Sequence, residues 1–329
     1  MPKSVDKRHK GILPASPKIV FMGTPDFSVP AFNALMEHGH NVLAVVTQPD
    51  RPRGRGRHVA FSPVKSAAEK YRLDILQPED ASDQQFVDIL RRKAPDLIVV
   101  VAFGRILKKD FLEIPHWGAL NIHASLLPKY RGAAPIQWAI LNGENKTGLT
   151  AMRMDEGLDT GPILHQEKVP VLEDETAGRL YDRLAGLSGE FLIKTLDNLA
   201  KNRLNNRPQD ESQATYAPKI GGSMSMVKWD QPAQVISALI HGLDPWPGSF
   251  TIVRGKKIKL FSSRVVEHDH EGRMPGMVLG QSQGALKVET VKGLLLIGEL
   301  QAPGKRRLAA VDFLRGFPLK KGTVLGGAA

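Results

Sequence analysis

Two polar side chains close a short apolar segment near the middle of the chain. Asn121 and His123 end the run from Ala119 to His123, which is typical of a buried strand. Because they are two residues apart, a strand places both side chains on one face, and open α/β sheets bind ligands at the carboxyl ends of their strands. A lone pair of this kind is more often a hydrogen-bonded strand end than a catalytic site, so other residues must support a catalytic role.

An acidic residue supplies that support. Asp159 lies in a glycine-flanked turn between two segments predicted to be strands, residues 148–154 and 163–171. An amide and an imidazole can donate hydrogen bonds to the oxyanion of a tetrahedral intermediate. Asp159 can orient His123, stabilise its cationic form and help to remove a proton from an attacking nitrogen. Asn121, His123 and Asp159 therefore indicate acyl transfer to an amine.

Other nucleophilic mechanisms find no support in the sequence. The chain contains no cysteine, which excludes a thiol nucleophile, disulfides and thiolate metal sites. It also lacks the Gly-x-Ser-x-Gly pattern that places a serine nucleophile on a sharp turn. The histidines show no metal-ligand spacing supported by acids on one element, and we expect no metal.

Several motifs together resemble those of the methionyl-tRNA formyltransferases. They are Asn-Ile-His at 121–123, Ser-Leu-Leu-Pro at 125–128, Arg-Gly-Ala-Ala-Pro-Ile-Gln-Trp at 131–138, Gly-Leu-Asp-Thr-Gly at 157–161 and Phe-Met-Gly-Thr-Pro-Asp-Phe at 21–27. The resemblance runs from about Lys18 to about Val324. It implies that 10-formyl-tetrahydrofolate is the formyl donor and that the α-amine of methionyl initiator tRNA is the acceptor.

The resemblance also implies a folate-binding segment. It comprises Ser125, Leu126, Leu127 and Pro128. The residues that follow, 129–132, are expected to place cationic and flexible groups at the mouth of the site. Ala124 stands where some family members have glycine, and this small-for-small difference leaves the expectation unchanged.

A basic loop follows the second predicted strand. Residues 51–58 carry Arg51, Arg53, Arg55 and Arg57 among glycines and one proline, and we expect no regular structure there. Such charge runs are usually solvated loops, but disordered basic segments also become ordered on RNA. The resemblance favours the second interpretation, in which the loop enters the acceptor-stem region of the tRNA and Arg55 matches the family's most important loop arginine.

The elements around the motifs predict an α/β fold, with a doubly wound, mostly parallel sheet. The expected strands are residues 18–23, 41–47, 74–77, 96–102 and 119–123, followed by the pair that flanks Asp159. The expected helices are residues 30–38, 64–71, 82–93, 135–142 and 176–201. The first turn, Gly-Thr-Pro-Asp, is not a dinucleotide-binding fingerprint.

The last third of the chain predicts a second, smaller domain. After a helix at 233–241, five short strands at 250–254, 256–265, 276–279, 285–290 and 294–300 indicate a small barrel, for which the resemblance implies an OB-like type. From residue 220 onward there are about 15 Lys and Arg against about 8 Asp and Glu, which is most of the formal charge of +11. Lys256, Lys257 and Lys259 are the predicted phosphate contacts in this domain.

We therefore predict four parts of the chain. They are a disordered extension or cloning remnant at 1–17, a catalytic domain at 18–204, a polar linker at 205–219 and a basic tRNA-binding domain at 220–329. No apolar stretch reaches the roughly 20 residues of a membrane span. We expect a monomeric cytoplasmic enzyme that binds folate and tRNA but no membrane.

Two alternatives remain open at this point. The same catalytic domain can formylate a sugar nucleotide or another small amine, or can hydrolyse formyl-folate, although neither reaction requires the arginine loop or a basic second domain. A tRNA-binding module with a lapsed catalytic domain is the second alternative. The presence of Asn121, His123 and Asp159 together argues against it.

Overall fold

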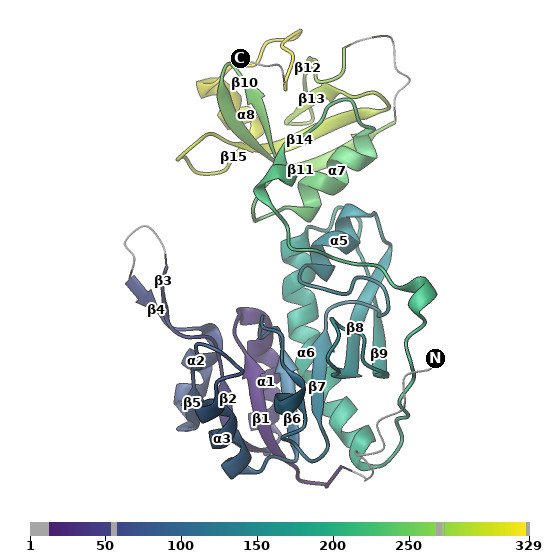
Figure 1. Ribbon diagram of the computed structural model, residues 1–329. Helices are drawn as coiled ribbons and strands as arrows, with labels where there is room; N and C mark the ends of the chain where they lie inside the picture. The colour runs from purple at the N-terminus through teal and green to yellow at the C-terminus, as the bar shows by residue number, and fades with distance from the viewer. Residues whose placement is uncertain (1–12, 54–57, 268–271, 273, 327–329) are drawn as a thin grey trace. The chain divides into compact units, whose positions relative to one another are not determined.

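The computed structural model describes residues 13–53, 58–267, 272 and 274–326 and divides into two compact units (Figure 1). Unit 1 comprises Met1–Pro135, Thr147–Val169 and Tyr181–Ala217. Unit 2 comprises Ile136–Lys146, Pro170–Leu180 and Pro218–Ala329. None of the helices in the described part of the chain is both long enough and apolar enough to cross a bilayer.

Unit 1 is built on a mixed seven-stranded sheet. In sheet order the strands are β5 (Asp74–Leu76), β2 (Asn41–Val46), β1 (Lys18–Gly23), β6 (Leu97–Val101), β7 (Ala119–His123), β8 (Lys146–Arg153) and β9 (Ile163–Pro170). The pairs from β5 to β7 are parallel, and β8 runs antiparallel to β7. The predicted mostly parallel α/β sheet is therefore confirmed, with the Asn-His strand in its interior.

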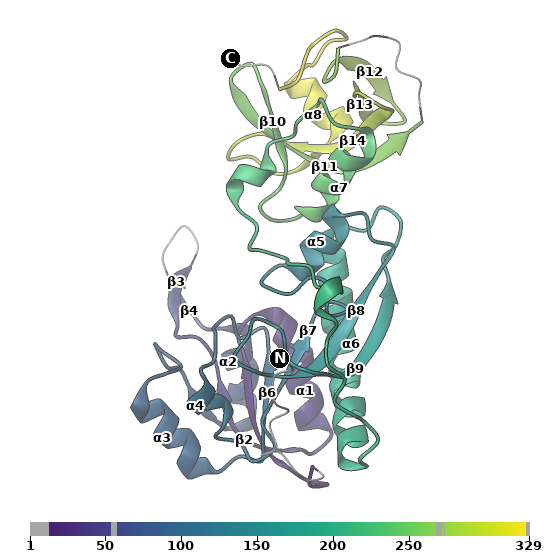
Figure 2. The ribbon, with the colours of Figure 1, turned by 45° about the vertical axis from the view of Figure 1, so that its right-hand side comes forward.

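Helices cover both faces of the parallel part of the sheet, as Figures 1 and 2 show. They are α1 (Val29–Glu37), α2 (Pro63–Ala68), α3 (Gln84–Lys93), α4 (Lys109–Leu112) and α6 (Ala177–Ala200), the last of which begins in unit 2. Because side chains alternate along a strand, Val20 and Met22 of β1 pack in the cluster with α3 and α4. Phe21 points to the opposite face, where its ring lies 5.4 Å from that of Phe32 on α1.

Unit 2 contains a curled antiparallel sheet in the order β10 (Phe250–Val253), β11 (Lys256–Val266), β14 (Leu294–Gln301), β13 (Ala285–Glu289) and β12 (Val278–Ser282). A short strand, β15 (Leu308–Ala309), adds to β14. The apolar face of the sheet packs with α7 (Ala233–Gly242) and α8 (Ala310–Gly316). This arrangement is consistent with the predicted OB-like domain. Helix α5 (Pro135–Leu141) also lies almost wholly in unit 2.

The arginine loop differs from its prediction. Residues at its two ends form an antiparallel hairpin of β3 (Arg51–Arg53) and β4 (His58–Ala60), so the expectation that residues 51–58 have no regular structure was wrong. A two-stranded ribbon needs only backbone hydrogen bonds, and proline is tolerated on an edge strand. The charge run therefore did not exclude it. In Figure 1 the hairpin projects from the rest of unit 1.

The ends of the predicted catalytic domain also gain detail. Most of the predicted N-terminal extension, residues 1–12, lies outside the described residues, and Leu13 is buried. Residues 205–217 of the predicted linker group with unit 1. The backbone of Arg207 pairs with Ile163 at the start of β9 through hydrogen bonds of 2.8 and 2.9 Å. The predicted domain boundaries themselves stay a prediction.

Candidate active site

Strand β7 brings Asn121 and His123 to one edge of the sheet. Asn121 pairs with Val100 of β6 and Met152 of β8, and the side chains of Asn121 and His123 are only 8% and 7% exposed. Within the described residues the Asn121 amide has no hydrogen-bond partner. Because nearly buried amides are normally hydrogen-bonded, its two N–H donors are available to a ligand.

The two ring nitrogens of His123 have different surroundings. Nε2 lies 2.9 Å from the backbone oxygen of Tyr130. A carbonyl oxygen only accepts, so this contact assigns the proton of the neutral ring to Nε2. Nδ1 lies 3.7 Å from Oδ2 of Asp159, which is too long for a hydrogen bond but suits an ion pair once Nδ1 is protonated. His123 is therefore oriented by Tyr130 and placed to take up a proton beside a carboxylate.

The Asp159 carboxylate is held by the backbone that follows Tyr130. Its Oδ2 accepts a hydrogen bond of 2.8 Å from the N–H of Gly132. Asp159 itself is in the left-handed region at φ 54°, which aspartate tolerates better than most residues. The turn before it is closed by Asp155, whose Oδ1 accepts from the Thr160 hydroxyl at 2.6 Å and from the Gly157 N–H at 3.1 Å.

Gly161 follows this turn at a point of close backbone approach. A Cβ on Gly161 lies 1.7 Å from the backbone oxygen of Arg153, so Gly161→Ala must push the Asp159 turn away from β8. We expect the free energy of unfolding, measured with denaturant, to fall by about 1–3 kcal/mol. We expect turnover, measured by steady-state kinetics, to fall by a larger factor. Gly186→Ala is the control, because no heavy atom lies within 4 Å of its added Cβ. Equal turnover in the two variants contradicts this prediction.

The predicted folate-binding segment is only partly accessible. The Ser125 hydroxyl donates to the Lys129 carbonyl at 2.6 Å, and Leu127 packs in a buried cluster with Met152 and Ile163. Leu126 and Pro128 are half-buried. Their side chains are therefore the ones in this segment that remain open to a ligand.

Arg131 corrects one expectation about the mouth of the site. We expected Arg131 to be one of the cationic groups there, but its side chain is 0% exposed and its guanidinium pairs with Glu211 and Gln209, whereas Lys129 is exposed. Hydrogen bonds to Glu211 raise the pKa of Arg131 above its ordinary value. A buried arginine needs such partners. Sequence reasoning missed both partners, because they are 78 and 80 residues away in a polar segment without periodicity.

The base of the arginine hairpin is fixed by a polar network. Asp50 is paired with Lys65 of α2, and Gln77 donates to Asp50 Oδ1 at 2.8 Å. The hydrogen bond from Lys65 lowers the pKa of Asp50 below its ordinary value. Arg51 is exposed, with its guanidinium 3.8 Å from the Glu79 carboxylate. The side chain of Arg53 is not described, and Arg55 and Arg57 lie outside the described residues.

The three predicted lysines of unit 2 have different roles in the structure. Lys256 and Lys257 are exposed, and their ammonium groups lie 5.6 Å and 3.6 Å from the ring centres of Phe317 and Phe250. Lys259 is half-buried and donates to the Pro247 carbonyl at 2.7 Å. Lys256 and Lys257 are therefore free to meet phosphate, whereas Lys259 already has a structural partner.

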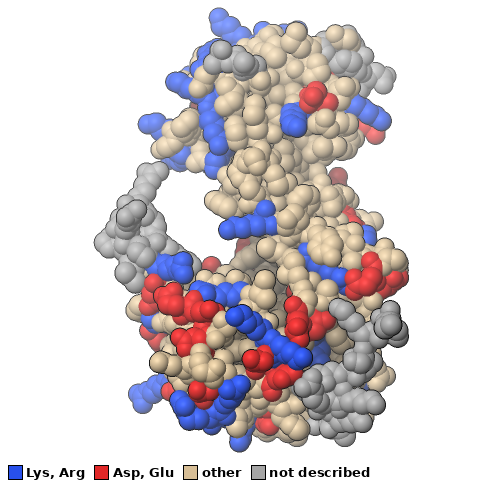
Figure 3. Space-filling view, in the orientation of Figure 1, with Lys and Arg blue, Asp and Glu red and all other residues tan. Residues whose placement is uncertain are grey.

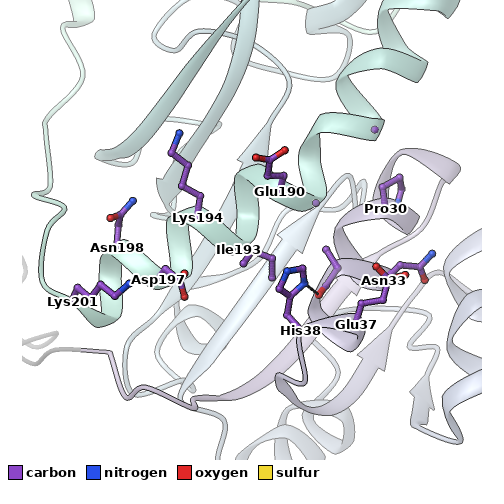
Figure 4. Close-up of a pocket in the computed structure, with 13 residues that line it drawn as sticks. Pro30, Asn33, Glu37, His38, Glu190, Ile193, Lys194, Asp197, Asn198 and Lys201 are labelled. Atoms are coloured by element: carbon purple, nitrogen blue, oxygen red, sulfur yellow. Dashed lines mark hydrogen bonds between the residues drawn. The ribbon is translucent and has the colours of Figure 1, made fainter.

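A separate groove lies between α1 and α6 (Figure 4), with a volume of about 780 Å³. Its lining contains acidic and basic side chains, including Glu37, Glu190, Asp197 and Lys194. None of the predicted site residues lines this groove. His38 at its edge is bound through Nδ1 to the Ala34 carbonyl at 2.9 Å. Within the described residues no three His, Cys, Asp or Glu side chains group as metal ligands, in this groove or elsewhere.

Comparisons with known proteins identify the family. The formyl transferase family model matches residues 17–196, and the model of the formyl transferase C-terminal domain matches residues 219–318. The methionyl-tRNA formyltransferase of Pelotomaculum thermopropionicum is 48% identical over 94% of this chain and 99% of its own length. The chain belongs to the methionyl-tRNA formyltransferase family. The enzyme of that name from Pelobacter propionicus is also 48% identical, over 96% of this chain and 98% of its own.

Two solved structures share the fold with this chain. A sugar 3N-formyl transferase, WlaRD, matches 90% of this chain and 100% of its own with a TM-score of 0.64 at 18% identity. HypX from Aquifex aeolicus in complex with tetrahydrofolic acid matches 95% of this chain and 51% of its own, with a TM-score of 0.62 at 20% identity. At these identities the likeness concerns the fold alone.

Proposed function

We propose that the protein transfers the formyl group of 10-formyl-tetrahydrofolate to the α-amine of methionyl initiator tRNA, which yields formylmethionyl-tRNA for translation initiation. One observation in the structure carries the chemistry. An unpartnered, nearly buried amide, Asn121, stands two residues from a histidine whose Nδ1 faces the carboxylate of Asp159. The names of relatives that are 48% identical over almost the whole chain indicate the acceptor.

The reaction needs one new bond and one broken bond. The methionyl nitrogen attacks the formyl carbon, and the tetrahedral intermediate collapses by releasing the folate nitrogen, which takes up a proton. Asn121 donates to the developing oxyanion through its free amide. The sequence led us to expect an imidazole donor to the oxyanion, but the Nε2–H of His123 is directed at the Tyr130 carbonyl. We therefore assign His123 the acceptance of the amine proton at Nδ1, with Asp159 at 3.7 Å stabilising the resulting imidazolium. This order assigns proton removal to His123 and a supporting charge to Asp159.

The residues present fit a folate donor at this site. Leu126 and Pro128 are half-buried next to the Asn-His strand and offer apolar contact, while Asn121 offers hydrogen-bond donors. Pockets for such ligands are typically apolar with a few convergent polar groups. Ser125 and Leu127 support the segment from within, because their side chains are buried.

The basic surface of unit 2 suits a phosphate backbone. Figure 3 shows Lys and Arg gathered on the side of this unit formed by β10 and β11, with little acidic surface there. Arg254, Lys256 and Lys257 are exposed members of this group. Together with Arg51, Arg53, Arg55 and Arg57 of the hairpin they form the proposed tRNA contacts, with the acceptor stem at the hairpin. The monomeric state and cytoplasmic location stay predictions.

The acceptor can be tested directly. The protein is incubated with 10-formyl-tetrahydrofolate and charged initiator tRNA, charged elongator tRNA, free methionine or an amino sugar nucleotide, and the formylated amine is identified. Formylation of charged initiator tRNA above the other three supports the proposal. Formylation of the sugar nucleotide alone, or release of formate without transfer, rejects it in favour of the other chemistries of this fold.

Salt should weaken tRNA binding far more than folate binding. If the basic groups track phosphates, the logarithm of tRNA affinity falls by about 0.7 to 0.9 per logarithmic unit of salt for each phosphate neutralised. Titrations of both ligands at several salt concentrations measure the slopes. Lys257→Ala should reduce the tRNA slope by about one phosphate and leave the folate slope unchanged. The same slope for both ligands shows that the positive charge of +11 does not serve tRNA binding.

A further inference from the structure

The segment that leads from α6 to unit 2 carries polar contacts that reach the proposed catalytic residues. We name residues 205–217 the strap; it belongs to unit 1 and ends immediately before Pro218, where unit 2 resumes. Its composition is that of a linker, yet its side chains make long-range hydrogen bonds. These contacts indicate that the strap has a structural role in unit 1 that its sequence did not predict.

Arg131 is the first anchor of the strap. Its Nε and Nη2 donate to Oε1 of Gln209 at 3.1 and 2.8 Å. Its Nη1 and Nη2 donate to the Glu211 carboxylate at 2.9 and 3.0 Å. A fork of this kind fixes both position and plane of the guanidinium, which a single charge contact does not. Arg131 is thus locked to the strap by two neighbouring side chains.

The other end of the Gln209 side chain holds the Asp159 turn. Its Nε2 donates to the backbone oxygens of Asp159 at 2.8 Å and Gly161 at 2.7 Å. An amide group can accept and donate at once, so Gln209 joins the Arg131 guanidinium to the turn that carries the catalytic carboxylate. Among side chains of this length, only an amide can both accept a hydrogen bond from a guanidinium and donate to backbone carbonyls.

Backbone hydrogen bonds also connect Arg131 to the strap. The Arg131 N–H donates to the Thr215 carbonyl at 2.9 Å, and the Arg131 carbonyl accepts from Ala217 at 2.7 Å. The residues on either side of Arg131 are those that touch the catalytic pair, since the Tyr130 carbonyl lies 2.9 Å from His123 and the Gly132 N–H donates to Asp159. By holding Arg131, the strap therefore restrains Tyr130, which contacts His123, and Gly132, which contacts Asp159.

We propose that Gln209 is a positioning residue for formyl transfer, which holds the Asp159 carboxylate opposite His123 by linking its turn to Arg131. The inference rests on the proposed function. Without this link the Asp159 and Gly161 carbonyls lose the Gln209 amide as a donor, while the contacts of Asp155 and Gly132 and the Lys109–Glu156 ion pair remain. Small errors in the placement of a charged group are costly in rate, because transition-state stabilisation depends on geometry.

Gln209→Glu separates the contact with the Asp159 turn from the contact with Arg131. The new carboxylate can still accept from Arg131, but it has no N–H for the Asp159 and Gly161 carbonyls. Gln209→Ala removes both contacts. Gln213→Ala is the matched control, because Gln213 is a strap glutamine whose Nε2 donates to Asp210 at 2.8 Å and, among the described residues, to no other group.

The test measures kcat, the KM of each substrate and Tm in all three variants. We expect Gln209→Glu and Gln209→Ala to lower kcat about 10-fold, with KM for charged initiator tRNA and for folate within about twofold of wild type. Gln213→Ala should match wild type. A fall in Tm with kcat preserved in Gln209→Glu overturns the proposal and leaves a purely structural strap. Wild-type protein that fails to formylate tRNA overturns the proposed function instead.

A double-mutant cycle distinguishes positioning from general damage. If Gln209 acts through Asp159, then Gln209→Glu combined with Asp159→Asn loses no more activity than Asp159→Asn alone, because the group being positioned is already gone. Independent, multiplied losses in the double variant contradict the proposal. The cycle uses folded proteins only, with circular dichroism and Tm as the check.

Discussion

His123→Ala is expected to lower kcat for formyl transfer by about 10²- to 10³-fold. His123 offers an imidazole on the same strand face as Asn121, and its Nδ1 lies 3.7 Å from the Asp159 carboxylate. In the proposed reaction the variant loses the group that takes the proton of the attacking amine. It also removes the hydrogen bond from the imidazole to the Tyr130 carbonyl, so Tm is expected to fall modestly while the protein remains folded. Steady-state kinetics with charged initiator tRNA measures the loss.

Three companion variants make the result interpretable. Asn121→Ala should lose a similar factor with little change in Tm, since its amide has no partner among the described residues. Asp159→Asn keeps the shape of the side chain and removes the charge that stabilises the imidazolium. His38→Ala removes the exposed histidine that follows α1 and should leave turnover unchanged. Wild-type turnover in folded His123→Ala protein rejects the assignment of that residue.

Arg55→Ala is expected to reduce formylation of charged tRNA about 100-fold while folate binding and Tm stay unchanged. The hairpin projects from the rest of unit 1, and the residues at its base are anchored by the Asp50–Lys65 pair. In the proposed function this arm places the acceptor end of the tRNA, so loss of Arg55 is expected to displace the reactive amine without disturbing the core. The measurements are turnover, folate affinity and Tm for the same preparation.

A matched control tests whether position or charge is responsible. Arg92→Ala removes one positive charge from an exposed position of α3 in the same unit and should change turnover by less than about twofold. If both variants change turnover by the same small factor, the loop is a solvated surface loop and does not bind tRNA. Loss of folate binding in Arg55→Ala shows instead that the loop belongs to the donor site.

Local patterns in the sequence were sufficient for most of the fold. The apolar run of β6 predicts a strand buried on both faces, and all five of its residues are buried. The spacing of two between Asn121 and His123 puts them on one face, and the strands that flank Asp159 are present as predicted. These inferences succeed because strand periodicity and turn chemistry act between near neighbours in the chain.

The tertiary structure alone decided how the proposed catalytic residues are held. Arg131 reads in the sequence as a surface charge and residues 205–217 as a linker, because charged and unperiodic segments usually face water. In the fold they meet across 78 to 80 residues and bury the arginine completely. Polar pairs at such separations leave no periodic signal, since a hydrogen bond requires only that two compatible groups arrive at one place. Which residues surround Asp159 was therefore settled by the packing of the chain and not by any local pattern.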